Sequence, residues 1–174
     1  MKNIALLVLD MLNDFVLEGA PLEVPSAREV VPHIKSEIAE ARKTGVPVIY
    51  ICDSHDEDDL EFERMAWPAH ALEVSEGAKV FDELNPLPED TVVTKKRYSG
   101  FYGTSLEAVL EEKAIKELMV TGCVTNICVL YTVADAVQRG YKVKVLTHCI
   151  AGLNHDDHEF ALKQMREVLG AEII

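Results

Sequence analysis

Hydrophobic residues along the chain occur either in short unbroken runs or at helical spacing. The first run, Ile4–Leu9, is apolar at every position, which is typical of a parallel strand covered by helices on both faces. A later segment has its apolar residues on one face of a helix, at Val30, Ile34, Ile38 and Ala41. The chain therefore begins with a predicted strand and a predicted helix.

The same alternation continues along the rest of the sequence. The motifs that begin at Ser26 and Thr104 have the Ser/Thr-x-x-Glu form of a capping box, which predicts a helix start at each. Residues 53–90 are acidic and lack periodicity, so we predict loops and short helical turns there. Further strands are predicted at 46–52, 91–94, 115–121, 141–146 and 172–174, and further helices at 104–113, 125–139 and 156–169.

This order of elements predicts one domain over residues 1–174. Repeated strand–helix units favour an α/β fold with a doubly wound, six-stranded parallel sheet in a Rossmann-like, three-layer arrangement. The length of 174 residues and the apolar content of 48% suit a globular domain with a sizeable core. In such folds the ligand crevice lies at the carboxyl ends of the strands, near the point where the strand order reverses.

Charge and hydropathy argue against several kinds of partner. The chain has 17 basic against 30 acidic residues and a net charge of -13, which repels nucleic acids and anionic membrane surfaces. No apolar run approaches the roughly 20 residues of a membrane span, and no signal-peptide pattern precedes Ile4. We therefore expect a cytoplasmic protein that binds neither nucleic acid nor membranes.

Polar and reactive side chains follow several of the predicted strands. A carboxylate, an ammonium and a thiol are the base, charge stabiliser and nucleophile that acyl transfer through a thioester needs. Two other interpretations stay open, because Asp10 also suits the cap of a loop and residues 95–97 also suit a solvated basic run. The strand-end residues are Asp10, Cys52, Asp53, Lys95, His148 and Cys149.

The thiol of interest belongs to Cys128, in the first turn of the helix predicted after Thr121 and Gly122. Unpaired backbone N–H groups and the helix dipole stabilise an anion there, so we expect this thiol to ionise more easily than usual. The alternative is a small buried apolar residue. The chain has no Cys-x-x-Cys pair, which argues against thiol-redox chemistry, and three cysteines are expected to pack in the core: Cys52, Cys123 and Cys149.

A second group joins Asp53 and His55, which are two residues apart at a predicted strand end, with the more distant His70. Their oxygen and nitrogen atoms suit zinc or a similar divalent ion and leave coordination positions open. The alternative for His55 is a hydrogen bond within an acidic loop. The remaining histidines are expected at surfaces or helix ends: His33, His148, His155 and His158.

Several short motifs, taken in order, are similar to those of one known family. Together they resemble the isochorismatase-like cysteine hydrolases, which include nicotinamidases and N-carbamoylsarcosine amidohydrolase. The resemblance covers nearly the whole chain. The motifs are Leu9-Asp10-Met11, Asn13-Asp14-Phe15, Asp53-Ser54-His55, Trp67-Pro68-Ala69-His70, Tyr98-Ser99-Gly100-Phe101-Tyr102-Gly103-Thr104 after Lys95, and Gly122-Cys123-Val124-Thr125-Asn126-Ile127-Cys128-Val129.

The resemblance implies a catalytic triad of Asp10, Lys95 and Cys128. Lys95 is implied rather than Lys96 because it stands four residues before the Ser-Gly-Phe motif. In the implied reaction, the aspartate takes the proton of the thiol, the lysine steadies the anions, and the thiolate attacks an amide carbonyl to form a thioester. The presence of Cys128 favours amide hydrolysis over the vinyl-ether hydrolysis that gives the family its name.

The resemblance also implies a cis peptide bond between Cys123 and Val124. This turn would aim the N–H groups of Val124 and Cys128 at the substrate oxygen, as an oxyanion hole.

Nicotinamidases hold a metal ion at the positions that match Asp53, His55 and His70. The resemblance therefore implies a divalent ion, with zinc as the first choice and iron or manganese as alternatives. Glu63, or its rival Glu61, lies near enough in sequence to be an additional ligand.

The resemblance implies nicotinamide as the first choice of substrate, with nicotinate and ammonia as products. Phe15 and Trp67 match positions that flank the pyridine ring, although ordinary core packing is an equal alternative for Phe15. Another small amide or a ureido compound is the alternative substrate, as for N-carbamoylsarcosine amidohydrolase, and a non-catalytic or thiol-redox binding domain is the alternative from a different class. His148 and Ala71 depart from common family residues, which weakens any claim to one substrate. Relatives commonly form dimers or tetramers, so we expect a homo-oligomer.

Overall fold

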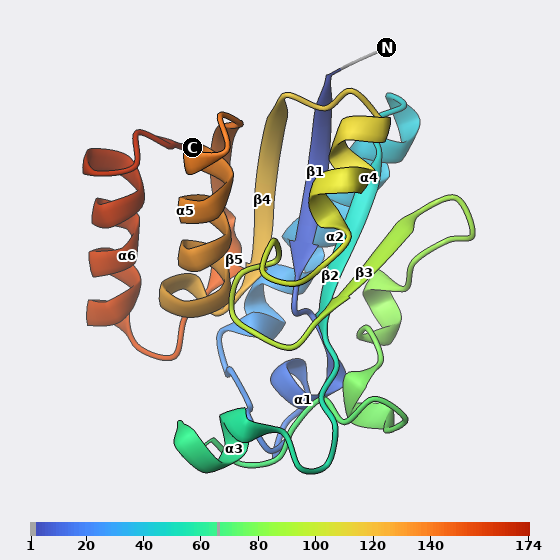
Figure 1. Cartoon of the computed structure of the whole chain (residues 1–174), viewed down its shortest axis with the longest axis vertical. Helices are drawn as coiled ribbons and strands as arrows, with labels where there is room; N and C mark the ends of the chain where they lie inside the picture. Colours follow the sequence, from blue (N-terminus) through green and yellow to red (C-terminus); the bar gives the residue numbers. More distant parts are fainter. Residues whose placement is uncertain (1–2, 66) are drawn as a thin grey trace.

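The computed structural model describes residues 3–65 and 67–174 and contains a six-stranded parallel sheet between layers of helices (Figure 1). Neighbouring strands are all parallel, in the order β3-β2-β1-β4-β5-β6. The predicted fold class is therefore confirmed. The strands are β1 (Ile4–Leu9), β2 (Val48–Asp53), β3 (Thr91–Lys95), β4 (Glu117–Cys123), β5 (Lys142–Ala151) and β6 (Glu172–Ile173).

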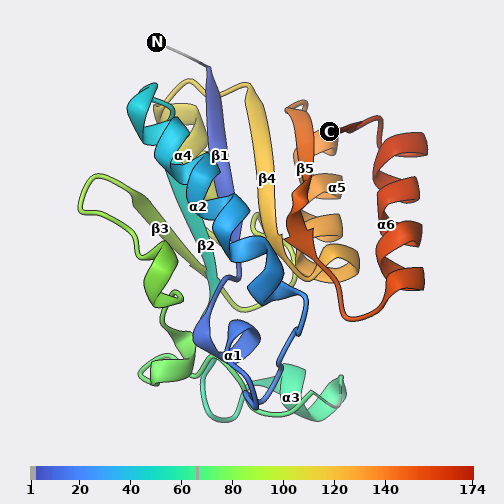
Figure 2. The same cartoon turned by 180° about the vertical axis from the view of Figure 1, so that it is seen from behind.

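The strand order reverses between β1 and β4. From β1 the chain adds β2 and β3 on one side, and it then returns to add β4, β5 and β6 on the other. The carboxyl ends of β1 and β4 therefore border the crevice where ligands of doubly wound sheets bind. The short helices α1 (Asn13–Val16) and α3 (Leu60–Arg64) lie at this end of the sheet (Figure 2).

Helices cover both faces of the sheet, and alternate residues of β1 belong to two separate cores. Leu6 and Val8 pack on the side of α2, whereas Ala5, Leu7 and Leu9 pack on the opposite side. Because each face is covered, every position of this strand is apolar, as its sequence predicts. One face carries α2 (Ala27–Lys43), and the other carries α4 (Leu106–Glu112), α5 (Leu130–Gln138) and α6 (His155–Glu167) (Figures 1 and 2).

Helices begin beside both predicted capping boxes, but neither Ser26 nor Thr104 makes the hydrogen bonds of a capping box. Ser26 precedes α2, but its side chain makes no cap and its hydroxyl donates to the Gly152 carbonyl at 2.8 Å. Thr104 accepts a hydrogen bond from the N–H of Leu106 and donates to the carbonyl of Gly100. In both cases the hydroxyl also has a backbone acceptor outside its helix, which a local motif does not reveal.

Strand β5 is longer than the sequence predicts. The predicted strand stops at residue 146, whereas β5 continues to Ala151 through a register shift against β4. His148 and Cys149 therefore lie within the strand and not at its carboxyl end, which corrects their expected position. His148 is exposed beside Glu37, with 3.5 Å between Nε2 and the nearer carboxylate oxygen, and Cys149 is buried in the core under α2.

In the described part of the long connection from β2 to β3, the helical elements are all short, as predicted. They are α3, η1 (Glu76–Ala78) and η2 (Asp82–Leu84). No helix in the described part of the chain has the length and apolar character needed to cross a membrane.

Candidate active site

The backbone at the ends of β1 and β4 brings polar side chains together. Asp10 directly follows β1 in a left-handed conformation, with φ 50°, which aspartate tolerates better than most residues. Its Oδ1 accepts a hydrogen bond from the N–H of Asp53 at 2.8 Å, which ties the ends of β1 and β2 together. Gly122, with φ 110°, lets β4 pass so close to β1 that a Cβ would lie 2.0 Å from the carbonyl oxygen of Leu9.

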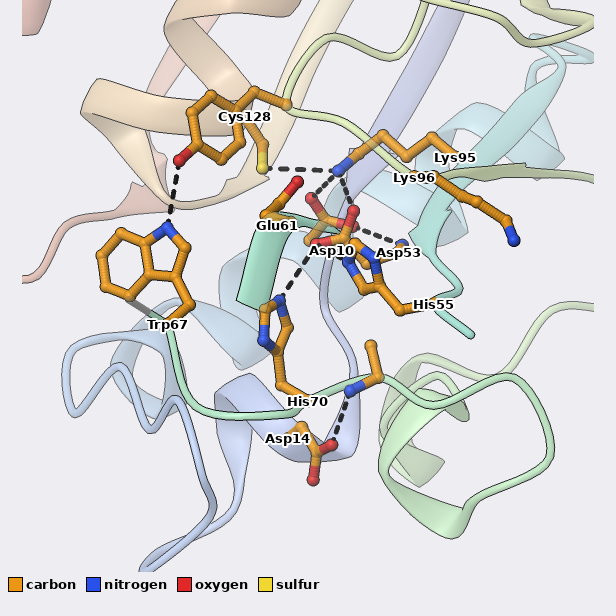
Figure 3. Close-up of polar contacts among 12 residues, drawn as sticks. Asp10, Asp14, Asp53, His55, Glu61, Trp67, His70, Lys95, Lys96 and Cys128 are labelled. Atoms are coloured by element: carbon orange, nitrogen blue, oxygen red, sulfur yellow. Dashed lines mark hydrogen bonds and ion pairs between the residues drawn. The ribbon is translucent and has the colours of Figure 1, made fainter. Parts of the chain in front are cut away.

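Asp10, Lys95 and Cys128 meet at this crevice, although they come from three separate segments (Figure 3). The Nζ atom of Lys95 lies 2.8 Å from Oδ2 of Asp10 and 3.4 Å from Sγ of Cys128. All three residues are buried. Lys96 instead is exposed and pairs with Asp56, so the structure favours Lys95, as the resemblance implies.

Burial and neighbouring charges shift the pKa values of Asp10 and Lys95 in this group. Burial and, to a smaller extent, the nearby charge of Asp53 raise the pKa of Asp10 to about 6 against the opposing effect of Lys95. Burial lowers the pKa of Lys95, but Asp10 and Asp53 outweigh it and keep this pKa well above its usual range. Asp10 is therefore a stronger base than an exposed aspartate, and Lys95 is a permanent cation beside it.

The expectation that Cys128 ionises easily in the resting protein is wrong. Burial raises the pKa of its thiol well above the usual value, and the charge of Asp10 adds to this effect against the opposing effect of Lys95. The desolvation of a buried thiolate thus outweighs its place near a helix start. Cys128 is held as a thiol, and a neighbouring base must accept its proton before it can act as a nucleophile.

The turn before Cys128 has the geometry that the resemblance implies. The peptide bond between Cys123 and Val124 is cis. Residues Thr125–Val129 then form a π-helical turn, η3, which leads directly into α5. Inside this turn, the Thr125 hydroxyl hydrogen-bonds to Nδ1 of His158 on α6 at 2.9 Å. Val124 and Cys128 both line a cavity at the end of the sheet.

Asp53, His55 and His70 also come together, directly beside Lys95 (Figure 3). Their candidate ligand atoms lie within 4.8 Å of one another, and the Nε2 atoms of His55 and His70 are 3.8 and 3.9 Å from Oδ2 of Asp53. The other ring nitrogens are held by Asp59, at 3.1 Å from His55, and by the carbonyl of Pro68, at 2.8 Å from His70.

This arrangement fits a divalent cation. Metal-binding histidines commonly use one ring nitrogen for the ion and hydrogen-bond through the other. Nε2 of His55 is buried and has no hydrogen-bond partner among the described residues, which is costly unless a ligand completes the site. One carboxylate with two imidazoles is a donor set suited to zinc, iron or manganese.

Of the two rival glutamates, Glu61 is the one that faces this group (Figure 3). Glu61 is buried on α3, and its Oε2 has no hydrogen-bond partner among the described residues. Burial raises its pKa, and the charge of Asp53 raises it further. Glu63 is exposed, so its suggested place as a ligand is not supported. The two residues are close in sequence, but the turn of α3 directs only Glu61 inward.

The cavity above Cys128 has mostly apolar walls. Trp67 and Phe15 both line it, as expected from the resemblance. The indole N–H of Trp67 donates to the hydroxyl of Tyr98 at 3.0 Å, and Phe15 meets the ring of His70 edge-on. The wall consists of Phe15, Leu22, Val24, Asp53, Glu61, Trp67, His70, Tyr98, Val124, Ile127, Cys128 and Leu153.

Several of these wall residues were missed by sequence reasoning. Tyr98 stands directly beside the Ser-Gly-Phe motif, which is the one signal that points to it. Leu22, Val24 and Leu153 lie outside the helices and strands, where periodicity gives no signal. The other expected surface histidines His33, His148 and His155 are exposed, and Cys52, Cys123 and Cys149 are buried as predicted. His158 differs, because it is half-buried in the first turn of α6 and bonded to Thr125.

A buried thiol, ammonium and carboxylate at the reversal point of a doubly wound sheet are the features of a cysteine hydrolase of three-layer α/β fold. The chain belongs to the isochorismatase family, because residues 4–174 match the family model described as the isochorismatase domain.

Solved structures of similar fold include three amidases. The pyrazinamidase/nicotinamidase from Streptococcus mutans UA159 is 31% identical, with a TM-score of 0.92 over 98% of this chain and 99% of that one. The N-carbamoylsarcosine amidase from Thermoplasma acidophilum is 34% identical, with a TM-score of 0.89 over 98% and 94%. The pyrazinamidase of Pyrococcus horikoshii, in complex with zinc, is 29% identical, with a TM-score of 0.91 over 99% of both chains. The expected enzyme class, a hydrolase of amide C–N bonds, is confirmed at this level.

Proposed function

We propose that this protein hydrolyses a small neutral amide through a thioester on Cys128, with nicotinamide as the substrate. The observation that carries the proposal is the placement of Lys95, whose ammonium contacts both the Asp10 carboxylate and the sulfur of Cys128, a residue that lines a largely apolar cavity. The likeness to a pyrazinamidase/nicotinamidase supports the choice of substrate.

In the proposed reaction Asp10 is the base and Cys128 the nucleophile. Asp10, whose pKa is raised to about 6, accepts the thiol proton as the sulfur attacks the amide carbonyl. The N–H groups of Val124 and Cys128 hold the resulting oxyanion, and Lys95 stabilises the negative charge around the sulfur. Asp10 then gives the proton to the departing ammonia. Water hydrolyses the thioester and releases a carboxylic acid.

Asp53, His55 and His70 are the residues that would hold a divalent ion, with Glu61 as an additional ligand. Nε2 of His55 and Oε2 of Glu61 are both buried and have no hydrogen-bond partner in the described part of the chain, which supports this assignment. Zinc is our first choice because a similar structure is a zinc complex, with iron and manganese as alternatives. A bound ion supplies positive charge and an open coordination position for the nitrogen of an aromatic ring.

The walls of the cavity favour a neutral aromatic amide over a ureido acid. None of the described residues that line it is lysine or arginine, whereas Asp53 and Glu61 are acidic. The carboxylate of an anionic substrate such as an N-carbamoyl amino acid would find no basic side chain on this wall, and only the ion proposed at Asp53, His55 and His70 would pair with it. Trp67 and Phe15 instead offer aromatic surfaces for a flat ring.

Ammonia release from nicotinamide and from N-carbamoylsarcosine, measured with the metal-loaded protein, tests this proposal. We expect turnover of nicotinamide and little turnover of the N-carbamoyl compound. Trp67→Ala is expected to raise KM for nicotinamide about 10-fold, because ring stacking and burial are lost, and to leave KM for a small aliphatic amide nearly unchanged. Preferential hydrolysis of N-carbamoylsarcosine would contradict the choice of substrate.

Two cysteine variants test the nucleophile separately from the substrate. Cys128→Ala is expected to lower kcat by more than about 10⁴-fold, because no thioester can form. Cys123→Ala is the matched control, since Cys123 is also buried, and its sulfur donates to the Asp10 carbonyl at 3.2 Å and packs in the core. Normal hydrolysis by Cys128→Ala would show that the nucleophile is another residue.

A further inference from the structure

Asp59 connects the candidate metal group to the short helix that forms one wall of the cavity. Its Oδ2 lies 3.1 Å from Nδ1 of His55, and its Oδ1 accepts a hydrogen bond from the N–H of Glu61 at 2.9 Å. This second contact makes Asp59 the N-cap of α3. Arg97 also donates to Oδ1, at 2.9 Å, and the Asp59 side chain is only 3% exposed. One buried carboxylate therefore holds a histidine, a helix start and a guanidinium.

Helix α3 has few other contacts to hold it in place. The ring of Phe62 packs against the rings of His55 and His70, with centroids 5.2 and 5.3 Å apart, and Oε2 of Glu61 lies 3.7 Å from Nη1 of Arg97. The helix spans five residues, too few to be stable as an isolated helix, and its one buried side chain is the acid Glu61. Leu60, which begins the helix, is 50% exposed. The helix lacks the apolar stripe that anchors α2 or α5 to the sheet. Its position therefore depends on the cap at Asp59, on the packing of Phe62 against the two histidines and on the charges around the Glu61 carboxylate.

The segment beyond α3 depends on the same anchor. Met65 directly follows the helix, and its sulfur accepts a hydrogen bond from the Tyr98 hydroxyl at 2.9 Å. The same hydroxyl accepts from the indole of Trp67. Movement of α3 would therefore displace both the Glu61 and the Trp67 portions of the cavity wall (Figure 3).

We infer that Asp59 is a positioning residue that couples divalent-ion binding at Asp53, His55 and His70 to the ordering of residues 59–65. This inference rests on the proposed metal site. With Nδ1–H of His55 donated to Asp59, the Nε2 lone pair is presented to the ion. A cation on Nε2 makes that N–H a stronger donor, which strengthens the contact of the imidazole with the capping carboxylate.

Glu61 provides a second connection between ion binding and the ordering of α3. Among the described residues its Oε2 has no hydrogen-bond partner, and the nearest cation is Arg97, with Nη1 at 3.7 Å. A metal ion held by the neighbouring group would add a second cation beside this carboxylate and so stabilise the helix that carries it. Coupling of this kind is reciprocal: ordering of α3 raises the ion affinity by the same factor by which the ion favours the ordered segment. The cavity wall is thus completed when the ion binds.

Hydrogen exchange and zinc affinity together test this coupling. In the wild-type protein, zinc is expected to slow amide exchange in residues 59–65 and to leave exchange in α5 unchanged. Asp59→Asn is expected to weaken zinc binding about 10- to 100-fold, measured by competition with a chromophoric chelator, and to abolish the zinc-dependent protection. Asp56→Asn is the matched control, because it removes an exposed ion pair with Lys96 from the same loop.

Either of two results would overturn this inference without contradicting the proposed metal site. One is zinc affinity of Asp59→Asn within about 2-fold of the wild-type value, below the loss expected for an outer partner of a metal ligand. The other is wild-type exchange in residues 59–65 that zinc does not change, a result that needs no variant to fold. A purely structural cap would raise exchange equally with and without zinc and leave zinc affinity intact. Wild-type protein that binds no zinc would overturn the proposed metal site as well.

Discussion

At the scale of single residues, Asp10 combines an unusual backbone with an unusual charge. Its left-handed φ and its buried carboxylate beside Lys95 both follow from its place directly after β1. Strand ends are where the sequence already indicated reactive groups, so Asp10, Asp53 and Lys95 were predictable from the rule that parallel strands end at one edge. The choice of Glu61 over Glu63 was not, because it depends on which side of a five-residue helix faces the cavity.

Asp10→Asn separates the backbone role of this residue from its chemical role. Asparagine tolerates the left-handed conformation as well as aspartate does, and Lys95 keeps its ion pair with Asp53, so the fold is expected to persist. An amide cannot accept the thiol proton, and kcat is expected to fall at least about 100-fold. Steady-state ammonia release and thermal unfolding measure the two effects. A variant with normal kcat would rule out Asp10 as the base.

At the scale of elements, the sheet was far more predictable than its edges and caps. Unbroken apolar runs such as Ile4–Leu9 identify strands covered on both faces, and their alternation with helical patterns identifies the topology class. The extension of β5 to Ala151 depends on a register shift, and the hydroxyl of Ser26 bonds to the distant Gly152. Both depend on contacts between segments far apart in the sequence, which a local pattern does not contain.

Gly122 is the element-scale feature whose loss is expected to cost most. In Gly122→Ala, the new Cβ clashes with the carbonyl of Leu9, and alanine must also adopt a positive φ. The free energy of unfolding is expected to fall by about 3 kcal/mol. For a chain of this size that corresponds to a decrease in Tm of roughly 6 to 12 °C.

Gly140→Ala is the control for this clash, because Gly140 has a φ of 86° but nothing within 4 Å of the added Cβ. It carries only the cost of the backbone conformation, on the order of 1 kcal/mol. Equal decreases in Tm for the two variants would show that the close approach of β4 to β1 is unimportant.

At the scale of the whole molecule, the sequence predicted many residues of the site but not the shape of the cavity that they line. Motif order along the chain indicated the members of both groups, whereas the cavity wall needs Leu22, Val24 and Leu153 from connections without periodicity. The pKa of Cys128 was mispredicted for a related reason, since the dehydration that raises it depends on the complete fold. The expected cytoplasmic location and homo-oligomer stay predictions.

Metal binding is expected to register in the stability of the whole chain. Protein prepared without chelators is expected to contain about one divalent ion per chain, as a site of one carboxylate and two imidazoles requires. Zinc at about 100 times its Kd would add about 2.7 kcal/mol to the free energy of unfolding, and a chelator would remove it. Elemental analysis and thermal unfolding with and without chelator measure these quantities.

Two histidine variants complete this test. His70→Ala is expected to lose both the ion and the effect of the chelator on Tm, while Cys128 still reacts with an alkylating reagent. His33→Ala, at an exposed histidine on α2, is expected to keep both. Metal-free wild-type protein with an unchanged Tm in chelator would contradict the proposed ion.

Asp53 belongs to both groups of the site, since one of its oxygens pairs with Lys95 and the other faces His55 and His70. The two groups therefore cannot diverge independently. A lineage or a design that replaces members of the proposed metal group to suit another ion changes the charge next to Lys95. A change at Lys95 in turn alters the basicity of Asp53, a proposed metal ligand. Single substitutions around Asp53 are expected to be poorly tolerated, and new specificity is expected to arise from the apolar wall that neither group uses.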